Sequence, residues 1–362
     1  MLGSLARVVA RFYQKNRSSS KHNQGGDFVY VANQGGNNIS QYRAAGNGSL
    51  FPLETVTVAA GTTPVFIAAH PTAKYVYVAN QGSNDISQYK IAENGSLVTL
   101  APPAAAGTAP VAIAIDPMGR YAYAVNNSSN ELSQYSIEPN GTLKALSPAT
   151  IVTGAVPVAV LVDPSGRYVY VVNNSSNNIS QFVISENGSL LPLSPATTGT
   201  GIAPRSMAID AYGKFACVVN RTSGNVTQYT ISSSGELKQI PGPVAAGKHP
   251  ISIAFSSTGI YAYVVNQNDN NISQYKLVDK VRLETMTPSS VVSLVTPVHI
   301  AVSMSGKFAY VCNITSNDIA QYAVDEAGKL SALPRNEWGD TTIKAGISPR
   351  CVICVSDKKT GE

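Results

Sequence analysis

The sequence predicts an all-β fold, namely a seven-bladed β-propeller with four antiparallel strands per blade. Three observations predict it: a repeat of 46 or 47 residues, four short β-type segments in each repeat, and partial repeats at the two chain ends. Seven times an Asn closes an apolar run and a Gln–aromatic pair follows eight residues later. The Asn residues are Asn33, Asn80, Asn126, Asn173, Asn220, Asn266 and Asn313. Their Gln partners are Gln41, Gln88, Gln134, Gln181, Gln228, Gln274 and Gln321.

The first complete unit, residues 64–107, divides at turn signals into four segments. In order they are PVFIAAH (64–70), KYVYVAN (74–80), DISQYKI (85–91) and a segment that starts at Leu97 after Asn94-Gly95. The segments are rich in Val, Ile, Tyr and Ala and show no 3.6-residue spacing, which excludes a helical solenoid. The second segment has no polar alternation, so both of its faces must be covered, as in sheets stacked around an axis.

The number of blades follows from the units. Six complete units begin at Pro64, Pro110, Pro157, Pro204, Pro250 and Pro297. Residues 27–58 supply the second to fourth strands of another blade, and residues 349–356 supply a first strand. We therefore expect the C-terminal strand to join the N-terminal blade and close the ring, which removes its open edges.

The charge distribution separates a basic tail from a neutral body. Residues 1–26 contain five basic residues and no acid, and the remaining 21 basic residues equal the 21 acidic ones. A neutral body with only 13% charged residues offers no surface for nucleic acid. The predicted organisation is a tail at 1–26, a propeller at 27–356 and a short tail at 357–362.

The N-terminal tail has two interpretations. Leu2, Leu5, Val9 and Phe12 lie near one face of a helix with Arg7 opposite, as in membrane-surface anchors and transit segments. A disordered leader is the alternative. Arg residues interrupt the apolar stretch that a secretory signal needs, and no transmembrane segment is predicted. The sequence leaves the cell surface, the periplasm and the cytoplasm of a microbe open.

Several kinds of chemistry lack their motifs. The four His are far apart without zinc spacing, and neither G-x-S-x-G nor a phosphate-binding G-x-x-x-x-G-K occurs. The Cys residues read as small core residues, since Cys351 and Cys354 would point to opposite faces of a strand. We expect no metal and no cofactor.

The repeat resembles that of the lactonase-type seven-bladed propellers, which include 6-phosphogluconolactonases, muconate-lactonising enzymes and YVTN-repeat surface proteins. The similarity is clear in Gly154-Ala155-Val156-Pro157, in Asp163-Pro164-Ser165-Gly166-Arg167-Tyr168 and in Tyr170-Val171-Val172-Asn173. It covers residues 27–356. The resemblance implies a ligand site at one mouth of the central channel, built from His, Arg and acidic groups, although no carboxylate is found near the start of the innermost strand here.

Departures from the repeat point to one part of that mouth. The residue after the unit Pro is Val65, Val111, Val158, Arg205, Ile251, Val298 and Arg350. The next position holds Phe66, Ala112, Ala159, Ser206, Ser252, His299 and Cys351, and Lys248 and His249 precede Pro250. Because the innermost strand enters the channel here, four consecutive blades would supply a cationic half of the mouth that suits an anionic small molecule.

The predicted catalytic residues are His249, His299, Arg205 and Arg350. A neutral His can take a proton from the attacking water, and an Arg can stabilise the oxyanion. The predicted ligand-binding residues are Lys248, Arg205, Arg350, Ser206, Ser252 and Trp338. The alternative is that each Arg pairs with a loop carboxylate, such as Asp85 or Asp318, that each His fills a surface gap, and that none of them has a chemical role.

A longer connection supports the same region. Six units have 13 or 14 residues from the unit Leu to the next Pro, but 19 separate Leu330 from Pro349. The extra residues surround Trp338, the sole Trp, with Glu337 and Asp340 beside it. They either lean over the mouth or extend the surface at the closure point.

The seven Asn and seven Gln are structural, since residues repeated on every blade cannot mark one site, and we expect Gln to bridge blades.

Two functions remain open from the sequence. High similarity among repeats and the lack of an evident acid favour a binding or interaction propeller, with a small anionic molecule or a protein as partner. The alternative is a lactone hydrolase that acts on a phosphorylated or carboxylated sugar lactone. We expect a monomer.

Overall fold

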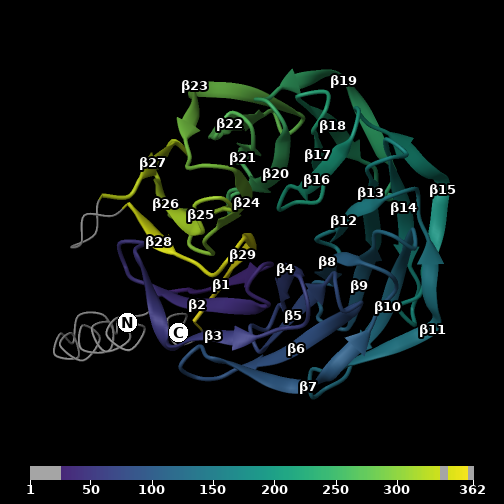
Figure 1. The fold of residues 1–362 in the computed structure, drawn as a ribbon. Helices are drawn as coiled ribbons and strands as arrows, with labels where there is room; N and C mark the ends of the chain where they lie inside the picture. Colours follow the sequence, from purple (N-terminus) through teal and green to yellow (C-terminus); the bar gives the residue numbers. More distant parts are fainter. Residues whose placement is uncertain (1–25, 335–340, 358–362) are drawn as a thin grey trace.

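A computed structural model describes residues 26–334 and 341–357, and Figure 1 shows its strands arranged as blades around a central channel. We number the blades from the first complete unit, so that blade 1 starts at Pro64 and blade 7 combines the two chain ends. Sheet order is sequential in every complete blade. Within the described residues, no helix is long and apolar enough to cross a membrane.

The strands are grouped here by their position in the blade. The innermost strands are β4 (Pro64–Ala69), β8 (Pro110–Ile115), β12 (Pro157–Val162), β16 (Pro204–Ile209), β20 (Pro250–Phe255), β24 (Pro297–Val302) and β29 (Pro349–Val355). The second strands are β5 (Tyr75–Asn80), β9 (Tyr121–Asn126), β13 (Tyr168–Asn173), β17 (Phe215–Asn220), β21 (Tyr261–Asn266), β25 (Phe308–Asn313) and β1 (Phe28–Asn33). The third strands are β6 (Asp85–Ile91), β10 (Glu131–Ile137), β14 (Asn178–Ile184), β18 (Asn225–Ile231), β22 (Asn271–Val278), β26 (Asp318–Val324) and β2 (Asn38–Ala44). The outer strands are β7 (Leu97–Ala105), β11 (Leu143–Val152), β15 (Leu190–Gly199), β19 (Leu237–Ala245), β23 (Arg282–Val292), β27 (Leu330–Ala332), β28 (Thr342–Lys344) and β3 (Leu50–Ala59).

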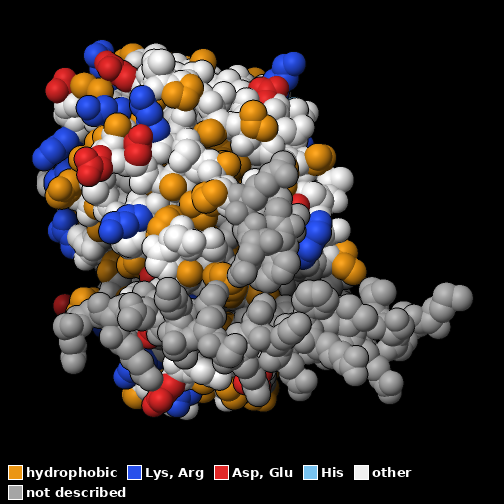
Figure 2. Space-filling model, turned by 90° about the vertical axis from the view of Figure 1, so that its left-hand side faces the viewer, with side chains coloured by type: hydrophobic (Ala, Val, Ile, Leu, Met, Phe, Trp, Pro, Cys, Tyr) orange, Lys and Arg blue, Asp and Glu red, His pale blue; other side chains and the backbone are white. Residues whose placement is uncertain are grey.

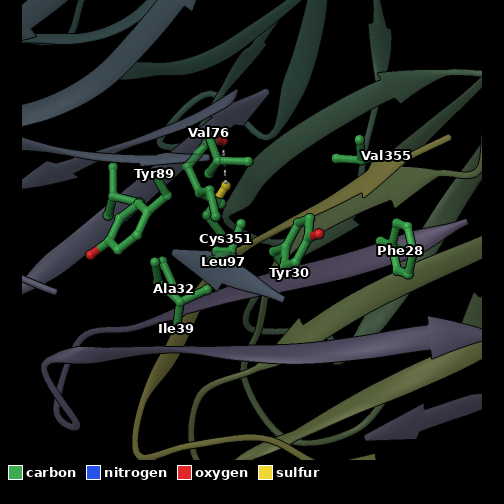
Figure 3. Packing of buried hydrophobic residues seen from close by; sticks show 11 residues of the cluster. Phe28, Tyr30, Ala32, Ile39, Val76, Tyr89, Leu97, Cys351 and Val355 are labelled. Atoms are coloured by element: carbon green, nitrogen blue, oxygen red, sulfur yellow. Dashed lines mark hydrogen bonds between the residues drawn. The ribbon is translucent and has the colours of Figure 1, made fainter. Parts of the chain in front are cut away.

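The predicted closure of the ring is confirmed. The sheet of blade 7 has the order β29-β1-β2-β3, and β29 pairs antiparallel with β1 from Phe28↔Val355 to Ala32↔Cys351. Figure 3 shows side chains from both ends of the chain, among them Tyr30 and Cys351, packed in one buried cluster with Val76 of blade 1. An ion pair between Arg43 and Asp357 adds a contact between the two ends. The C-terminal strand therefore completes both a sheet and a core.

The extra residues before Pro349 interrupt the outer edge of blade 6. Strand β27 pairs with one half of β26 and β28 pairs with the other half, so the two short strands together replace one long outer strand. Residues 335–340, with Trp338, Glu337 and Asp340, lie outside the described part of the chain. The strands that flank them belong to the outer edge of the blade, away from the channel (Figure 1).

The hydrophobic core lies between neighbouring blades. The second strands are almost completely buried; in β13, for example, Tyr170 and Val172 are inaccessible to solvent. One cluster joins Tyr170 and Val172 with Met207 and Val218 of the following blade. This explains why these strands show no polar alternation, because each face is covered by an adjacent sheet. Figure 2 shows the outer wall of the ring, where most of the visible Lys, Arg, Asp and Glu side chains lie towards one rim.

The repeated Gln residues bridge adjacent blades, as predicted. In every blade the Gln Oε1 accepts the backbone N–H of the Leu that begins the next blade's outer strand, at 2.6 to 2.8 Å. Gln321 makes this bond to Leu50 and so carries the pattern across the closure. The Gln Nε2 donates to its own outer strand, for example to the carbonyl of Pro148 from Gln134. Buried amides of this kind are costly to leave unpaired, which explains their recurrence.

Two sets of Tyr hydroxyls also tie blades together. The second-strand Tyr donates to a turn Gly of the next blade, as Tyr123 does to Gly188 at 2.8 Å. Cys217 replaces this Tyr in blade 4, where the facing turn of blade 5 contains Asp279 and Lys280, both with positive φ, and no Gly. The third-strand Tyr donates to the end of the preceding outer strand, and Phe182 is the one residue of this set that lacks the hydroxyl.

Candidate ligand site at the channel mouth

The innermost strands all begin at one end of the channel, which we call the entry face. Pairing between each innermost strand and the second strand slips by one residue directly after the unit Pro, so the next residue is bulged in all seven blades. A bulge redirects a side chain and is common beside binding sites. Five blades place Val or Ile there, whereas blades 4 and 7 place Arg205 and Arg350.

The structure brings Arg205 and Arg350 together at this face. Blades 4 and 7 are three steps apart in a ring of seven, so the two arginines enter the channel from nearly opposite sides. Burial lowers the pKa of Arg205, and the positive charges of Arg350 and Arg221 lower it further. Burial also lowers the pKa of Arg350. The mouth therefore concentrates like charges in a partly desolvated space, which an anion would stabilise.

Neither arginine pairs with a loop carboxylate within the described residues. Arg350 Nε donates to Gln34 Oε1, and Arg205 has no ion pair or side-chain hydrogen bond there. Asp85 instead accepts a hydrogen bond from Asn80 at 2.6 Å, and Asp318 accepts one from Ser316 at 2.9 Å. Asp85 and Asp318 therefore do not form the ion pairs with Arg205 or Arg350 that the alternative interpretation expected.

Arg221 is a member of this cluster that the sequence reasoning missed. It directly follows the repeat residue Asn220, a position that holds Gln34, Gln81, Asn127, Asn174, Arg221, Gln267 and Ile314 around the ring. Arg221 is the only cation at this position, so the same comparison of repeats that selected Arg205 would have found it. Its charge acts on Arg205, which places both at the same mouth.

His299 lies beside β29, where both of its ring nitrogens contact the residues that follow Arg350. Nδ1 accepts the backbone N–H of Val352 at 3.4 Å, Nε2 lies 3.6 Å from Cys351 Sγ, and the ring meets Phe66 edge-on with centroids 5.9 Å apart. Burial lowers the pKa of His299 to about 4, so the ring is neutral near pH 7. Its Nδ1 lone pair is already used, which leaves it poorly placed to act as a base.

His249 and Lys248 line an open hollow between blades 4 and 5. The hollow measures about 560 Å³, and its lining includes Arg221, Gly224 and Asp269 as well. His249 has a positive φ of 53°, and its Nδ1 is buried without a hydrogen-bond partner. Asp269 Oδ2 accepts the backbone N–H of Lys248 at 2.7 Å. A carboxylate thus does lie near the start of an innermost strand, contrary to the sequence expectation.

The remaining predicted residues contribute less. Ser252 is buried, and its Oγ accepts the backbone N–H of Ile300 at 3.4 Å, so its hydroxyl lies towards blade 6. Ser206 is half-buried on β16 beside Arg205. Trp338 lies outside the described residues. In the described ranges, no three His, Cys, Asp or Glu side chains are grouped so as to hold a metal ion.

The sequence matches the family model described as lactonase, 7-bladed beta-propeller, over residues 7–115, 103–251 and 244–350. These segments cover most of the chain. The chain belongs to this lactonase family. No curated protein matches the sequence.

Solved structures share the lactonase-family fold. A protein of Bacteroides fragilis, provisionally assigned as a 6-phosphogluconolactonase, superposes with a TM-score of 0.81 at 21% identity and covers 93% of this chain and 99% of its own. A protein of Bacteroides uniformis with the same provisional assignment has a TM-score of 0.80 at 22% identity, covering 92% and 100%. The periplasmic gluconolactonase PpgL of Pseudomonas aeruginosa has a TM-score of 0.74 at 20% identity, covering 91% and 99%. At these identities the likeness establishes the fold.

Proposed function

We propose that this lactonase-family propeller hydrolyses a sugar lactone that carries an anionic group, such as a phosphate. The observation that carries the proposal is the convergence of Arg205, Arg350 and Arg221 at the entry face without a carboxylate paired to Arg205 in the described residues. Family membership and the names of the structural neighbours support the same reaction class. They favour the hydrolase over the binding propeller that the sequence put first.

In the proposed reaction, the arginines stabilise the negative charge that develops on the carbonyl oxygen of the lactone. A water oxygen adds to the lactone carbonyl carbon, and the guanidinium groups of Arg205 and Arg350 stabilise the oxyanion that forms. Half-burial strengthens this interaction because less water screens the charges. The ring C–O bond then breaks, and the alkoxide leaving group takes up a proton to give a hydroxy acid.

His249 is the proposed proton carrier. It accepts a proton from the attacking water and returns one to the departing alkoxide, so the proton count balances. His249 suits this role better than His299 because its ring has no hydrogen-bond partner in the described structure, whereas His299 Nδ1 already accepts the Val352 N–H. His299 instead packs edge-on against Phe66 and beside Cys351.

The test is hydrolysis of 6-phosphogluconolactone and of unphosphorylated gluconolactone, followed by proton release above the spontaneous rate. We expect wild-type turnover, and a loss of at least about a hundredfold in Arg205→Ala and Arg350→Ala, as for removal of an oxyanion donor. Arg120→Ala is the matched control, since Arg120 is an exposed arginine at a turn that follows an innermost strand. Wild-type protein with no turnover above the spontaneous rate would refute the proposal.

A further inference from the structure

The hollow between blades 4 and 5 exists where the chain omits a hydrogen bond that the other blades keep. In six blades, the loop after the second strand ends in an Asn with positive φ, and its side-chain oxygen accepts the backbone N–H of the residue that precedes the next unit Pro. The N···O distances are 2.7 or 2.8 Å. The pairs are Asn37–Thr63, Asn84–Ala109, Asn130–Val156, Asn177–Ala203, Asn270–Thr296 and Asn317–Ser348.

Gly224 takes the place of this Asn in blade 4. The backbone N–H of His249 therefore lacks the side-chain oxygen that accepts the equivalent N–H in the other blades. Gly224 keeps the same left-handed backbone, with φ at 63°. No hydrogen bond from the His249 N–H is found in the described structure. A Cβ at Gly224 would meet only the carbonyl oxygen of Gly247, at 3.7 Å, so the space is open. The substitution therefore creates a hollow and an unpaired backbone donor together.

The charges around the hollow favour an anion. Arg221 and Lys248 contribute two cations, and Asp269 contributes one carboxylate whose Oδ2 is taken up by the Lys248 N–H. The Arg221 side chain has no partner among the described residues. A backbone N–H next to guanidinium and ammonium groups is the usual donor set for a phosphate.

We propose that this hollow holds the phosphate group of the substrate, with Arg221, Lys248 and the His249 N–H as donors, while Arg205 and Arg350 hold the lactone or carboxylate end. The identity of the substrate rests on the proposed function. Arg221 connects the two parts, because it lines the hollow and its charge also acts on Arg205.

Gly224→Asn is the decisive variant. It restores the residue that six blades carry at this φ, so the fold tolerates it, and its side chain would occupy both the hollow and the His249 N–H. We expect it to raise the melting temperature, because it adds a hydrogen bond and restricts the unfolded chain. Arg221→Ala removes the guanidinium alone. Asn177→Gly is the matched control, since it opens the equivalent space in blade 3 without the cations.

The measurement is equilibrium binding of 6-phosphogluconate, gluconate and glucose 6-phosphate by calorimetry. Gly224→Asn and Arg221→Ala should each weaken both phosphorylated ligands at least tenfold and leave gluconate unchanged. Arg350→Ala should weaken 6-phosphogluconate and gluconate instead, and Asn177→Gly should change none of the three.

Three results would overturn the assignment: wild-type protein that does not bind 6-phosphogluconate, unchanged affinity for it in Gly224→Asn, or an equal loss for gluconate in that variant. If the variants show the expected binding pattern but the wild-type protein hydrolyses no lactone, the phosphate site is supported and the proposed function is refuted. The two proposals therefore fail separately.

Discussion

Acidification should destabilise this propeller through His299. Its ring packs against Phe66 and Cys351, and burial lowers its pKa from 6.5 to about 4. Between these two pKa values the unfolded chain binds a proton at this position and the folded protein does not. The free energy of unfolding therefore falls as the pH drops below about 6.5, and the loss is complete below about pH 4.

The size of the effect follows from the shift. Each pKa unit corresponds to about 1.4 kcal/mol, so the difference between the two values gives roughly 3 kcal/mol as an upper figure. His299→Asn keeps an oxygen near the position of Nδ1, which can accept the Val352 N–H, but it cannot be protonated. We expect this variant to be less stable than wild type near pH 8, because it leaves space beside Phe66.

The assay is urea unfolding of both proteins at one-unit steps from pH 8 to pH 4. The stability gap between wild type and His299→Asn should shrink by roughly 3 kcal/mol over this range, with most of the change between about pH 6.5 and pH 4. Parallel pH profiles for the two proteins would refute the argument. They would show that His299 is protonated equally in the folded and unfolded states.

Three further predictions concern the hydrogen bonds between blades and the charge cluster. Phe182→Tyr should gain about 1 kcal/mol of stability by donating to the carbonyl at the end of the preceding outer strand, Val152, and an unchanged urea midpoint would contradict this. Gln134→Leu should lose about 1 to 3 kcal/mol in the same assay, because it leaves the Leu190 N–H buried without an acceptor; a loss below about 0.5 kcal/mol would be inconsistent with this bond. Arg205→Met should stabilise the ligand-free protein by about 1 kcal/mol while it lowers turnover at least about a hundredfold, and equal or lower thermal stability would count against an uncompensated charge at this site.

Departures from the repeat identify candidate site residues, and the innermost strands show the clearest ones. Arg205 and Arg350 stood out because the other blades have Val or Ile at that position, and the structure places them at one mouth. Arg221, Gly224 and Asp269 depart from the repeat just as clearly, but they lie in loops whose contacts with the following blade cannot be read from spacing. The contacts that these residues make depend on which backbone N–H groups of the following blade lie beside them.

The sequence by itself determined the architecture, because a 46- or 47-residue period with four β-type segments is typical of a propeller blade, and the complementary chain ends fix the count at seven. The tertiary structure alone decided what each departure from the repeat contacts. His299 and His249 both lie within two residues of a unit Pro, yet one is packed against Cys351 and the other borders an open hollow. Burial and unpaired hydrogen-bond donors depend on contacts between blades, and these arise only when the ring has closed.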